Sequence, residues 1–285
     1  MSAPAVLGVK PRIVVFDSGV GGLSIVQSMA TRLPGFELIY VADNARFPYG
    51  DLAESEVIER CRALVGALVD MHSADLVVIA CNTASTVVLP TLRAELAVPV
   101  VGVVPAIKPA AALSQTHRIA LLATPATVRR AYLDTLIAEF ASHCDVFRLG
   151  SSELVRIAEA SLAGEAPSVA AVQAIVHPLA GSGVDAVVLG CTHFPLIREV
   201  LRSALPEVVH WVDSGDAIAR RVTTLWAELC AHAREDRQRS TTVDLPPLAH
   251  VYFTAALPEG VPDFLRACGW PRLHSVPNWQ PESDG

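Results

Sequence analysis

The chain has 285 residues, of which 52% are apolar and only 6% aromatic, a composition typical of helices packed on parallel strands rather than of a β-sandwich. Its net charge of −7 and isoelectric point of about 5.7 argue against nucleic acid or an anionic membrane as a general partner. No apolar run reaches the roughly 18 residues of a transmembrane helix, and the first residues lack the basic segment of a secretory signal. We therefore expect a soluble, cytoplasmic protein.

Short runs of Val, Ile and Leu alternate with amphipathic stretches along the chain, which predicts βαβ units and mainly parallel sheet. The predicted strands are 12–17, 37–43, 75–81, 98–104, 118–124, 145–149, 185–191 and 208–213. The predicted helices include 54–70, 126–141, 168–180 and 195–205.

The eight predicted strands form two sets of four that repeat each other. The segment DLVVIAC at 75–81 matches DAVVLGC at 185–191, and RIVVFDS at 12–18 matches RIALLAT at 118–124. We therefore predict an α/β fold of two pseudo-symmetric domains. Each domain should be a mainly parallel four-stranded sheet flanked by helices, with the active site in the cleft between them.

The repeat also predicts domain boundaries. We expect residues 1–103 and a returning C-terminal segment, 216–285, to form the first domain, and residues 104–215 to form the second. The polar run at 234–240 resembles an exposed helix end or a linker. Pro-rich segments after residue 241 and a weaker pattern at 251–268 indicate a loosely built terminus.

The first predicted strand-to-helix turn, FDSGVGGLS at 16–24, is rich in glycine. One interpretation is a nucleotide-binding turn, with Asp43 at the next strand end as the acid that would bind a ribose. However, the spacing is G-x-G-G rather than G-x-G-x-x-G, and the Asp17 carboxylate would repel a pyrophosphate. We favour a role for Asp17 in polarising a neighbouring thiol.

The loop ADNARFPYG at 42–50 has two interpretations that the sequence leaves open. It is either a tight turn that covers a sheet edge or a lid whose backbone N–H groups touch a ligand. The segment DSGD at 213–216 begins a predicted helix, with Ser214 as a suitable N-cap.

Two of the six cysteines end predicted strands at corresponding positions. Cys81 is followed by Asn82 and Thr83, and Cys191 by Thr192 and His193. Since ligands bind at the carboxyl ends of parallel strands, both thiols should face one cleft from opposite walls. The cysteines form neither a C-x-x-C pair nor a zinc-finger spacing, so we expect no metal site.

Buried cysteines often serve only as small hydrophobic residues, but this pair allows three chemistries. A phosphatase needs Arg six residues after the cysteine, where this chain has Val87 and Ile197. Dithiol redox chemistry stays open, although it leaves the adjacent polar residues unexplained. We favour the third: two thiols that act as base and acid on opposite faces of one carbon and so invert a stereocentre.

Two further residue types bear on this hypothesis. His193 stands two residues after Cys191 and could assist that thiol. The chain has only two lysines, Lys10 and Lys108, and neither lies in an obvious cofactor pocket. A pyridoxal-phosphate racemase needs a lysine for its Schiff base, so we expect chemistry without a cofactor.

Five motifs together, FDSGVGGLS, A-D-x-A-R-x-PYG, ACNTAS, the TPAT of 124–127 and GCTHFP, resemble the glutamate racemase family in order and across nearly the whole chain. The resemblance implies two α/β domains, no cofactor, and interconversion of L- and D-glutamate for peptidoglycan synthesis, with a homodimer as the assembly. It implies that Cys81 deprotonates D-glutamate with help from Asp17, and that Cys191 deprotonates L-glutamate with help from His193.

The resemblance also implies the remaining site residues. Glu159 in VRIAE takes the place of a family glutamate, although Gly150, Ser151 and Ser152 replace the family's preceding Ala-Cys-Pro. The residues expected to bind the amino acid are Asp17, Ser18, Tyr49, Gly50, Asn82, Thr83, Thr124, Thr192 and His193.

Two alternatives accompany this hypothesis. Racemases of aspartate and of hydantoins share the paired cysteines, so aspartate is an alternative substrate. A non-catalytic, two-lobed amino-acid-binding protein would have the same plan, but its ligand binding would survive the loss of either thiol.

Overall fold

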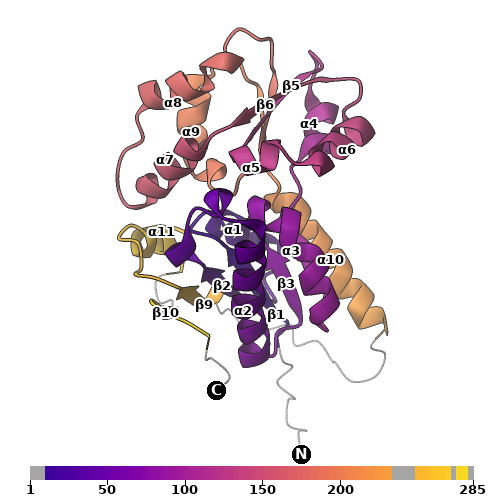
Figure 1. Cartoon of the computed structure of the whole chain (residues 1–285), viewed down its shortest axis with the longest axis vertical. Coiled ribbons are helices and arrows are strands. Elements are labelled where there is room, and N and C mark those ends of the chain that lie inside the picture. Colours follow the sequence, from indigo (N-terminus) through magenta and orange to yellow (C-terminus); the bar gives the residue numbers. More distant parts are fainter. Residues whose placement is uncertain (1–9, 233–247, 271–273, 282–285) are drawn as a thin grey trace, which may run out of the picture.

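The computed structural model describes residues 10–232, 248–270 and 274–281, and the polar run at 234–240 lies outside them. The chain folds into two α/β lobes, one above the other in Figure 1. Each lobe contains one parallel sheet with helices on both faces, as the sequence predicts.

The sheet of the first lobe has six parallel strands in the order β10-β9-β2-β1-β3-β4. The strands are β1 (Arg12–Asp17), β2 (Glu37–Ala42), β3 (Leu76–Ile79), β4 (Val100–Gly102), β9 (Leu248–Phe253) and β10 (His274–Val276). Along β1, Ile13 and Val15 pack into the core on one face and Val14 and Phe16 into the core on the other. Burial on both faces explains why the strand is a continuous apolar run rather than an alternating one.

The sheet of the second lobe has four parallel strands in the order β6-β5-β7-β8. The strands are β5 (Arg118–Ala123), β6 (Asp145–Gly150), β7 (Ala186–Leu189) and β8 (His210–Val212). This order repeats β2-β1-β3-β4 of the first sheet, so the two lobes share one topology, as the matching sequence segments predict.

Helices cover both faces of each sheet. In the first lobe, α1, α10 and α11 contribute to one core and α2 and α3 to the other. In the second lobe, α7, α8 and α9 cover one face, and α4 and α6 the other. The α-helices are α1 (Leu23–Arg32), α2 (Glu54–His72), α3 (Asn82–Glu95), α4 (Ile107–Leu113), α5 (Pro125–Val128), α6 (Ala131–Phe140), α7 (Ser152–Leu162), α8 (Val169–Val176), α9 (Arg198–Ala204), α10 (Gly215–His232) and α11 (Val261–Ala267). Short 3₁₀ helices are η1 (Asn44–Arg46), η2 (Tyr49–Asp51), η3 (His177–Leu179) and η4 (Phe194–Ile197).

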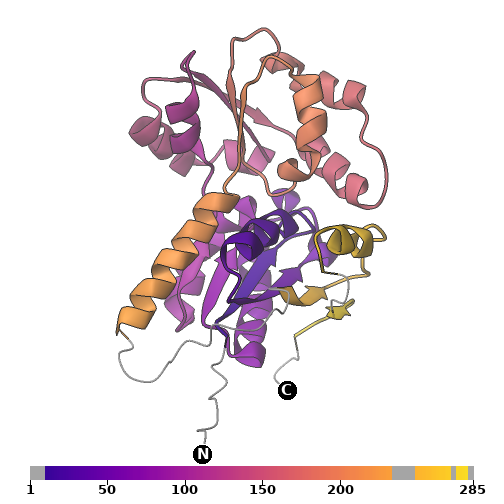
Figure 2. The ribbon, with the colours of Figure 1, turned by 180° about the vertical axis from the view of Figure 1, so that it is seen from behind.

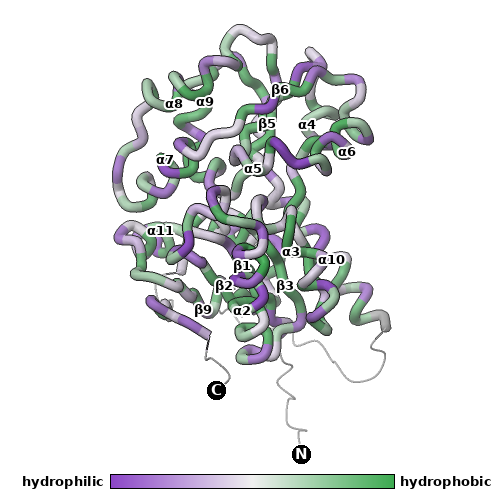
Figure 3. The backbone as a smooth tube through the Cα atoms, in the orientation of Figure 1, coloured by the Kyte–Doolittle hydropathy of each residue, from purple (hydrophilic) through white to green (hydrophobic). Residues whose placement is uncertain are grey.

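Helix α10 returns the chain from the second lobe to the first. It begins shortly after β8 and runs down the back of the first lobe (Figure 2), where Ile218 and Val222 enter the core beside α1. Much of the tube inside both lobes is hydrophobic, shown green in Figure 3. Among the helices of the described residues, none is both long enough and apolar enough to cross a bilayer.

The C-terminal segment corrects two expectations. The first sheet has six strands rather than four, and the residues after 241 include an ordered strand, β9, that pairs with β2 from Leu38 to Ala42. Val251 and Phe253 of β9 are fully buried. The sequence pattern missed this strand because its partner lies about 200 residues earlier, and local periodicity carries no information on such pairing. The boundaries 1–103 plus 216–285 and 104–215 remain a proposal, with which the membership of the two sheets agrees.

Candidate active site

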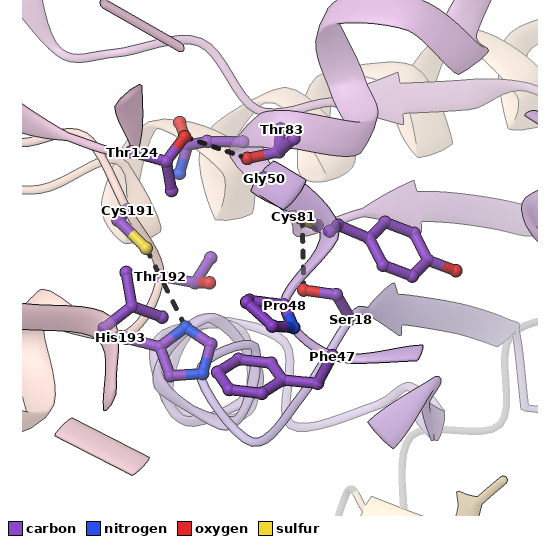
Figure 4. Close-up of a pocket in the computed structure, with 13 residues that line it drawn as sticks. Ser18, Phe47, Pro48, Gly50, Cys81, Thr83, Thr124, Cys191, Thr192 and His193 are labelled. Atoms are coloured by element: carbon purple, nitrogen blue, oxygen red, sulfur yellow. Dashed lines mark hydrogen bonds between the residues drawn. The ribbon is translucent and has the colours of Figure 1, made fainter. Parts of the chain in front are cut away.

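A pocket lies between the two lobes, at the carboxyl ends of the central strands. Asp17 ends β1 and Thr124 follows β5, while Cys81 and Cys191 stand two residues after β3 and β7. The pocket holds little free space, about 20 Å³ for the centre of a water molecule. Figure 4 shows its lining. The lining residues are Ser18, Phe47, Pro48, Tyr49, Gly50, Cys81, Asn82, Thr83, Thr124, Val155, Cys191, Thr192 and His193.

Cys81 is the N-cap of α3, and its Sγ accepts a hydrogen bond from the Ala84 N–H at 3.5 Å. The Ser18 hydroxyl lies 3.5 Å from the same sulfur. Burial, and secondly the carboxylate of Asp17, raise the pKa of Cys81 to about 12. Cys81 is therefore held as a thiol, with donors from the helix end already placed to stabilise a thiolate.

Cys191 has a different set of neighbours. Its Sγ lies 3.8 Å from His193 Nδ1, and His193 Nε2 lies 2.7 Å from Glu159 Oε2. Burial lowers the pKa of His193, but its hydrogen bonds to Cys191 and Glu159 outweigh burial and raise that pKa well above the ordinary value. The imidazole can therefore carry a proton beside the sulfur while Glu159 balances its charge.

Asp17 reaches Cys81 only indirectly. One carboxylate oxygen accepts the Gly19 N–H at 2.9 Å and the Ser18 hydroxyl at 3.5 Å, and Ser18 in turn contacts the Cys81 sulfur. The other oxygen accepts the Thr192 hydroxyl at 2.9 Å. Burial is the main cause of the raised pKa of Asp17. The carboxylate thus joins the two lobes and lies behind Ser18, rather than directly against the thiol as the sequence suggested.

The glycine-rich turn packs against the second lobe. A Cβ atom on Gly21 would lie 2.4 Å from His193 Nδ1 and 2.7 Å from Thr192 Oγ1, too close for any side chain. The turn needs glycine here because two lobes meet across it. This contact fills the space in front of Gly21, which leaves a nucleotide pyrophosphate no place there.

Polar groups at the first turn of α3 face the pocket. The Asn82 side chain is buried, and its Oδ1 has no hydrogen-bond partner. The hydroxyl groups of Thr83 and Thr124 lie 3.1 Å apart across the two lobes, and Thr124 caps α5 by accepting the Thr127 N–H. Burying a hydrogen-bond acceptor without a partner costs free energy, so Asn82 Oδ1 is a candidate to accept a hydrogen bond from a ligand.

The loop at 42–50 contributes pocket residues rather than covering a sheet edge alone. The Tyr49 hydroxyl donates a hydrogen bond to Asp43 Oδ2 at 2.6 Å, so its hydrogen is already used within the protein. Gly50 lies next to Thr124 of the second lobe. The Phe47 ring packs on the His193 imidazole, with centroids 5.4 Å apart.

Phe47, Pro48 and Val155 also line the pocket, although none of them is among the site residues predicted from the sequence. Phe47 and Pro48 belong to the motif that contains Tyr49, which is the signal that could have identified them. Val155 stands one helical turn before Glu159 on α7, and i, i+4 residues share a helix face. Conversely, Asp17 and Glu159 lie behind the lining residues, to which they are hydrogen-bonded.

All six cysteines are free thiols in the structure, Cys81 and Cys191 included. These two nevertheless interact, because Cys191 is among the groups that raise the pKa of Cys81. Two reduced thiols in one pocket, each with its own polar partners, fit proton transfer better than a structural disulfide.

Comparison with known proteins identifies the family. A family model described as Asp/Glu/Hydantoin racemase matches residues 21–222. A glutamate racemase from Shewanella sp. (strain MR-4) is 47% identical over 266 residues, 93% of this chain and 96% of that protein. One from Pectobacterium carotovorum subsp. carotovorum (strain PC1) is 51% identical over 228 residues, 79% of this chain and 80% of that protein.

The solved structure of Escherichia coli glutamate racemase, in complex with L-glutamate and the activator UDP-MurNAc-Ala, superposes with a TM-score of 0.82. It is 44% identical in sequence, and the match covers 94% of this chain and 99% of that one. The chain therefore belongs to the Asp/Glu/hydantoin racemase family, in its glutamate racemase branch.

Proposed function

We propose that the protein interconverts L-glutamate and D-glutamate without a cofactor, using Cys81 and Cys191 as its two acid–base groups. One observation carries the proposal: the two thiols line one pocket but come from different lobes, each at the carboxyl end of its strand. A substrate held between the lobes would then present opposite faces of its Cα to the two sulfurs.

The proposed reaction is balanced without any further reagent. In one direction, the Cys191 thiolate takes the Cα proton of L-glutamate and becomes a thiol, leaving a carbanion stabilised by the adjacent carboxyl group. The Cys81 thiol then gives its proton to the opposite face of Cα and becomes a thiolate. The product is D-glutamate. The reverse reaction starts from the Cys81 thiolate, so each direction ends with the thiols poised for the other.

The polar lining supports an amino acid with two carboxylates as the substrate. The unpartnered Oδ1 of Asn82 can accept a hydrogen bond from the α-ammonium. Thr83, Thr124 and Thr192 supply hydroxyl groups, and the N-terminus of α3 favours a carboxylate. Glutamate is the amino acid in the complex of the Escherichia coli relative.

The substrate would also make Cys81 a better base, although burial and Asp17 raise the pKa of this thiol to about 12. The substrate ammonium brings a positive charge close to Cys81, and a nearby cation favours the thiolate. The Ser18 hydroxyl lies between Asp17 and the Cys81 sulfur and contacts both. Glu159 keeps the His193 imidazole oriented and charged beside Cys191.

In this proposal the protein works as a cytoplasmic homodimer that supplies D-glutamate for peptidoglycan synthesis, and glutamate rather than nucleic acid or a membrane is its partner. Aspartate is the alternative substrate, because the family description covers both acidic amino acids. A glutamate side chain is one methylene longer, which a narrow pocket can distinguish by about 1–3 kcal/mol.

The test compares L-glutamate, D-glutamate and L-aspartate by optical rotation and chiral chromatography, with wild type, Cys81→Ser and Cys191→Ser. Wild type should racemise glutamate far faster than aspartate, and each variant should lose about 10²–10⁴-fold in kcat while keeping its circular dichroism spectrum. If wild type racemised aspartate but not glutamate, the substrate would be aspartate. Glutamate binding without turnover in wild type would instead favour a non-catalytic binding protein.

A further inference from the structure

A second cluster of reactive side chains lies in the second lobe, apart from the pocket. His117, His143 and Cys144 bring one nitrogen or sulfur atom each to within 4.8 Å of one another. Both histidines are exposed and Cys144 is half-buried. His117 precedes β5, and the other two precede β6. The active-site pocket lies at the carboxyl ends of these strands, about 20 Å away over six residues of strand.

We propose that His117, His143 and Cys144 form a binding site for a divalent transition-metal ion, with Zn²⁺ as the best match. Imidazole nitrogen and thiolate sulfur are the donors that Zn²⁺ prefers, and three protein ligands leave a fourth position for water. With bonds of about 2.0–2.3 Å, tetrahedral ligand atoms lie roughly 3.3–3.7 Å apart. The three side chains must therefore close by about 1 Å, a shift that rotation of exposed side chains can supply.

The backbone around the cluster is already fixed. The Asp145 N–H donates to the His117 carbonyl at 2.7 Å, which ties the two loops together. Asp185 holds the loop before His117 by accepting the N–H groups of Gln115 and Thr116 at 2.7 and 3.0 Å. His117 itself has a φ of 56°, an unusual conformation for a residue other than glycine. Because the loops are pre-arranged, binding would require little more than side-chain rotation.

The surrounding charges are mixed, because two carboxylates lie near Cys144 while Arg118, next to His117, forms a 3.7 Å ion pair with one of them, Asp145. The carboxylates of Asp145 and Asp185 act electrostatically on the Cys144 sulfur. The centroids of the two imidazole rings lie 5.5 Å apart, and the ring planes are inclined at 77°. A nitrogen of each ring can therefore bind the same ion. An ion held here would connect the α4–β5 and α6–β6 loops and stabilise the second lobe without touching the pocket.

The experiment uses tag-free, full-length protein, treated with EDTA and kept reduced, and titrates it with Co²⁺ as a spectroscopic substitute for Zn²⁺. We expect one equivalent to produce the d–d bands of tetrahedral cobalt and a thiolate-to-cobalt charge-transfer band. Zn²⁺ should then displace the cobalt. Cys144→Ser should abolish the charge-transfer band, and His117→Asn and His143→Asn should each weaken cobalt binding roughly tenfold or more.

Cys268→Ser is the matched control, since Cys268 is another half-buried free thiol but ends α11 of the first lobe. This variant should keep the full cobalt spectrum. The proposal is overturned if wild type shows no charge-transfer band, or if Cys144→Ser keeps it, because the metal would then be absent or bound by other thiols. Cobalt spectra require no turnover, so this result is independent of the proposed racemase activity, which all three ligand variants should retain.

Discussion

The Thr254 hydroxyl donates a 2.6 Å hydrogen bond to Asp43 Oδ1, joining the end of the C-terminal strand β9 to the end of β2. Asp43 also accepts bonds from Arg60 and from the pocket residue Tyr49. Thr254 Oγ1 accepts the Ala45 N–H at 3.0 Å. The C-terminal segment thus holds the loop that carries Phe47, Pro48, Tyr49 and Gly50 in the pocket.

Thr254→Val should therefore weaken substrate binding rather than the proton transfers. The variant removes both hydrogen bonds at nearly constant shape, and a loss of about 1 kcal/mol corresponds to roughly fivefold in KM. We expect kcat to change little and Thr254→Ser to restore the wild-type KM. Steady-state kinetics in both directions, with optical rotation as the readout, would measure this.

The matched control for Thr254→Val is Ser114→Ala. Ser114 also donates to a carboxylate, that of Asp185, and is also buried, but it lies in the second lobe away from the pocket. Its loss should reduce the melting temperature with no effect on KM. An equal rise in KM for both variants would mean that Thr254 acts only through global stability.

Gly21→Ala should damage both stability and activity. Its new Cβ would lie 2.4 Å from the His193 ring, which must move away from Cys191 or push the lobes apart. We expect a loss of about 1–3 kcal/mol in stability and a large fall in kcat. Gly66→Ala, within α2 and with no atom within 4 Å of its added Cβ, should instead stabilise the protein by up to about 1 kcal/mol. Urea unfolding of both variants would compare the two sites, and an unaffected Gly21→Ala would contradict the close approach.

The His193 pKa predicts how stability depends on pH. Its folded-state pKa is raised well above the ordinary 6.5, so the folded protein holds the proton more tightly than the unfolded chain. This contribution is fully present below about pH 6.5 and is lost as the pH rises through the folded-state pKa. The stability difference between wild type and His193→Gln should therefore be greatest below pH 6.5 and shrink above it. Urea titrations from pH 6 to 9 test this, with exposed His177→Gln as the control, and a difference that grows with pH would refute the assignment.

The pKa of about 12 at Cys81 predicts its reactivity. Only the thiolate reacts with iodoacetamide, so the alkylation rate of Cys81 in the ligand-free protein should keep rising about tenfold per pH unit beyond pH 9. An ordinary thiol levels off near its pKa of about 9. Peptide mass spectrometry at several pH values, with a small-molecule thiol as reference, would follow the rate. A plateau of the alkylation rate at or below pH 9 would show that the pocket does not raise the pKa of Cys81.

Much of the fold was predictable because its signals are local. The predicted strand 12–17 coincides with β1, and the others differ from the observed strands by three residues or fewer at each end. The helix predicted at 126–141 divides into α5 and α6, with Arg130 N–H bonded to the Thr127 carbonyl at the break. Helix propensity alone does not predict where the helix is interrupted. Strands β9 and β10 were not predicted, because they depend on pairing with distant segments.

The site was predictable where a residue type and its place in a motif imply the chemistry, as at Cys81 and Cys191. Supporting residues carry no such signal. The sequence offered Asp43 only as an acid for a ribose, yet it is the anchor of the pocket loop. Likewise, nothing in the segment around Thr254 indicates contact with a loop more than 200 residues earlier. Val155 lines the pocket as an ordinary apolar residue of a helix.

The central claim is that two different groups exchange protons on opposite faces of one carbon, and isotope incorporation tests it most directly. L-glutamate and D-glutamate are incubated separately with enzyme in D₂O, and early samples are analysed for deuterium at Cα in each enantiomer. With two bases, the newly formed enantiomer should carry deuterium while the remaining substrate keeps its hydrogen, in both directions. Equal labelling of both enantiomers from the start, or product that retains the original hydrogen, would mean that one base serves both faces and would contradict the roles of Cys81 and Cys191.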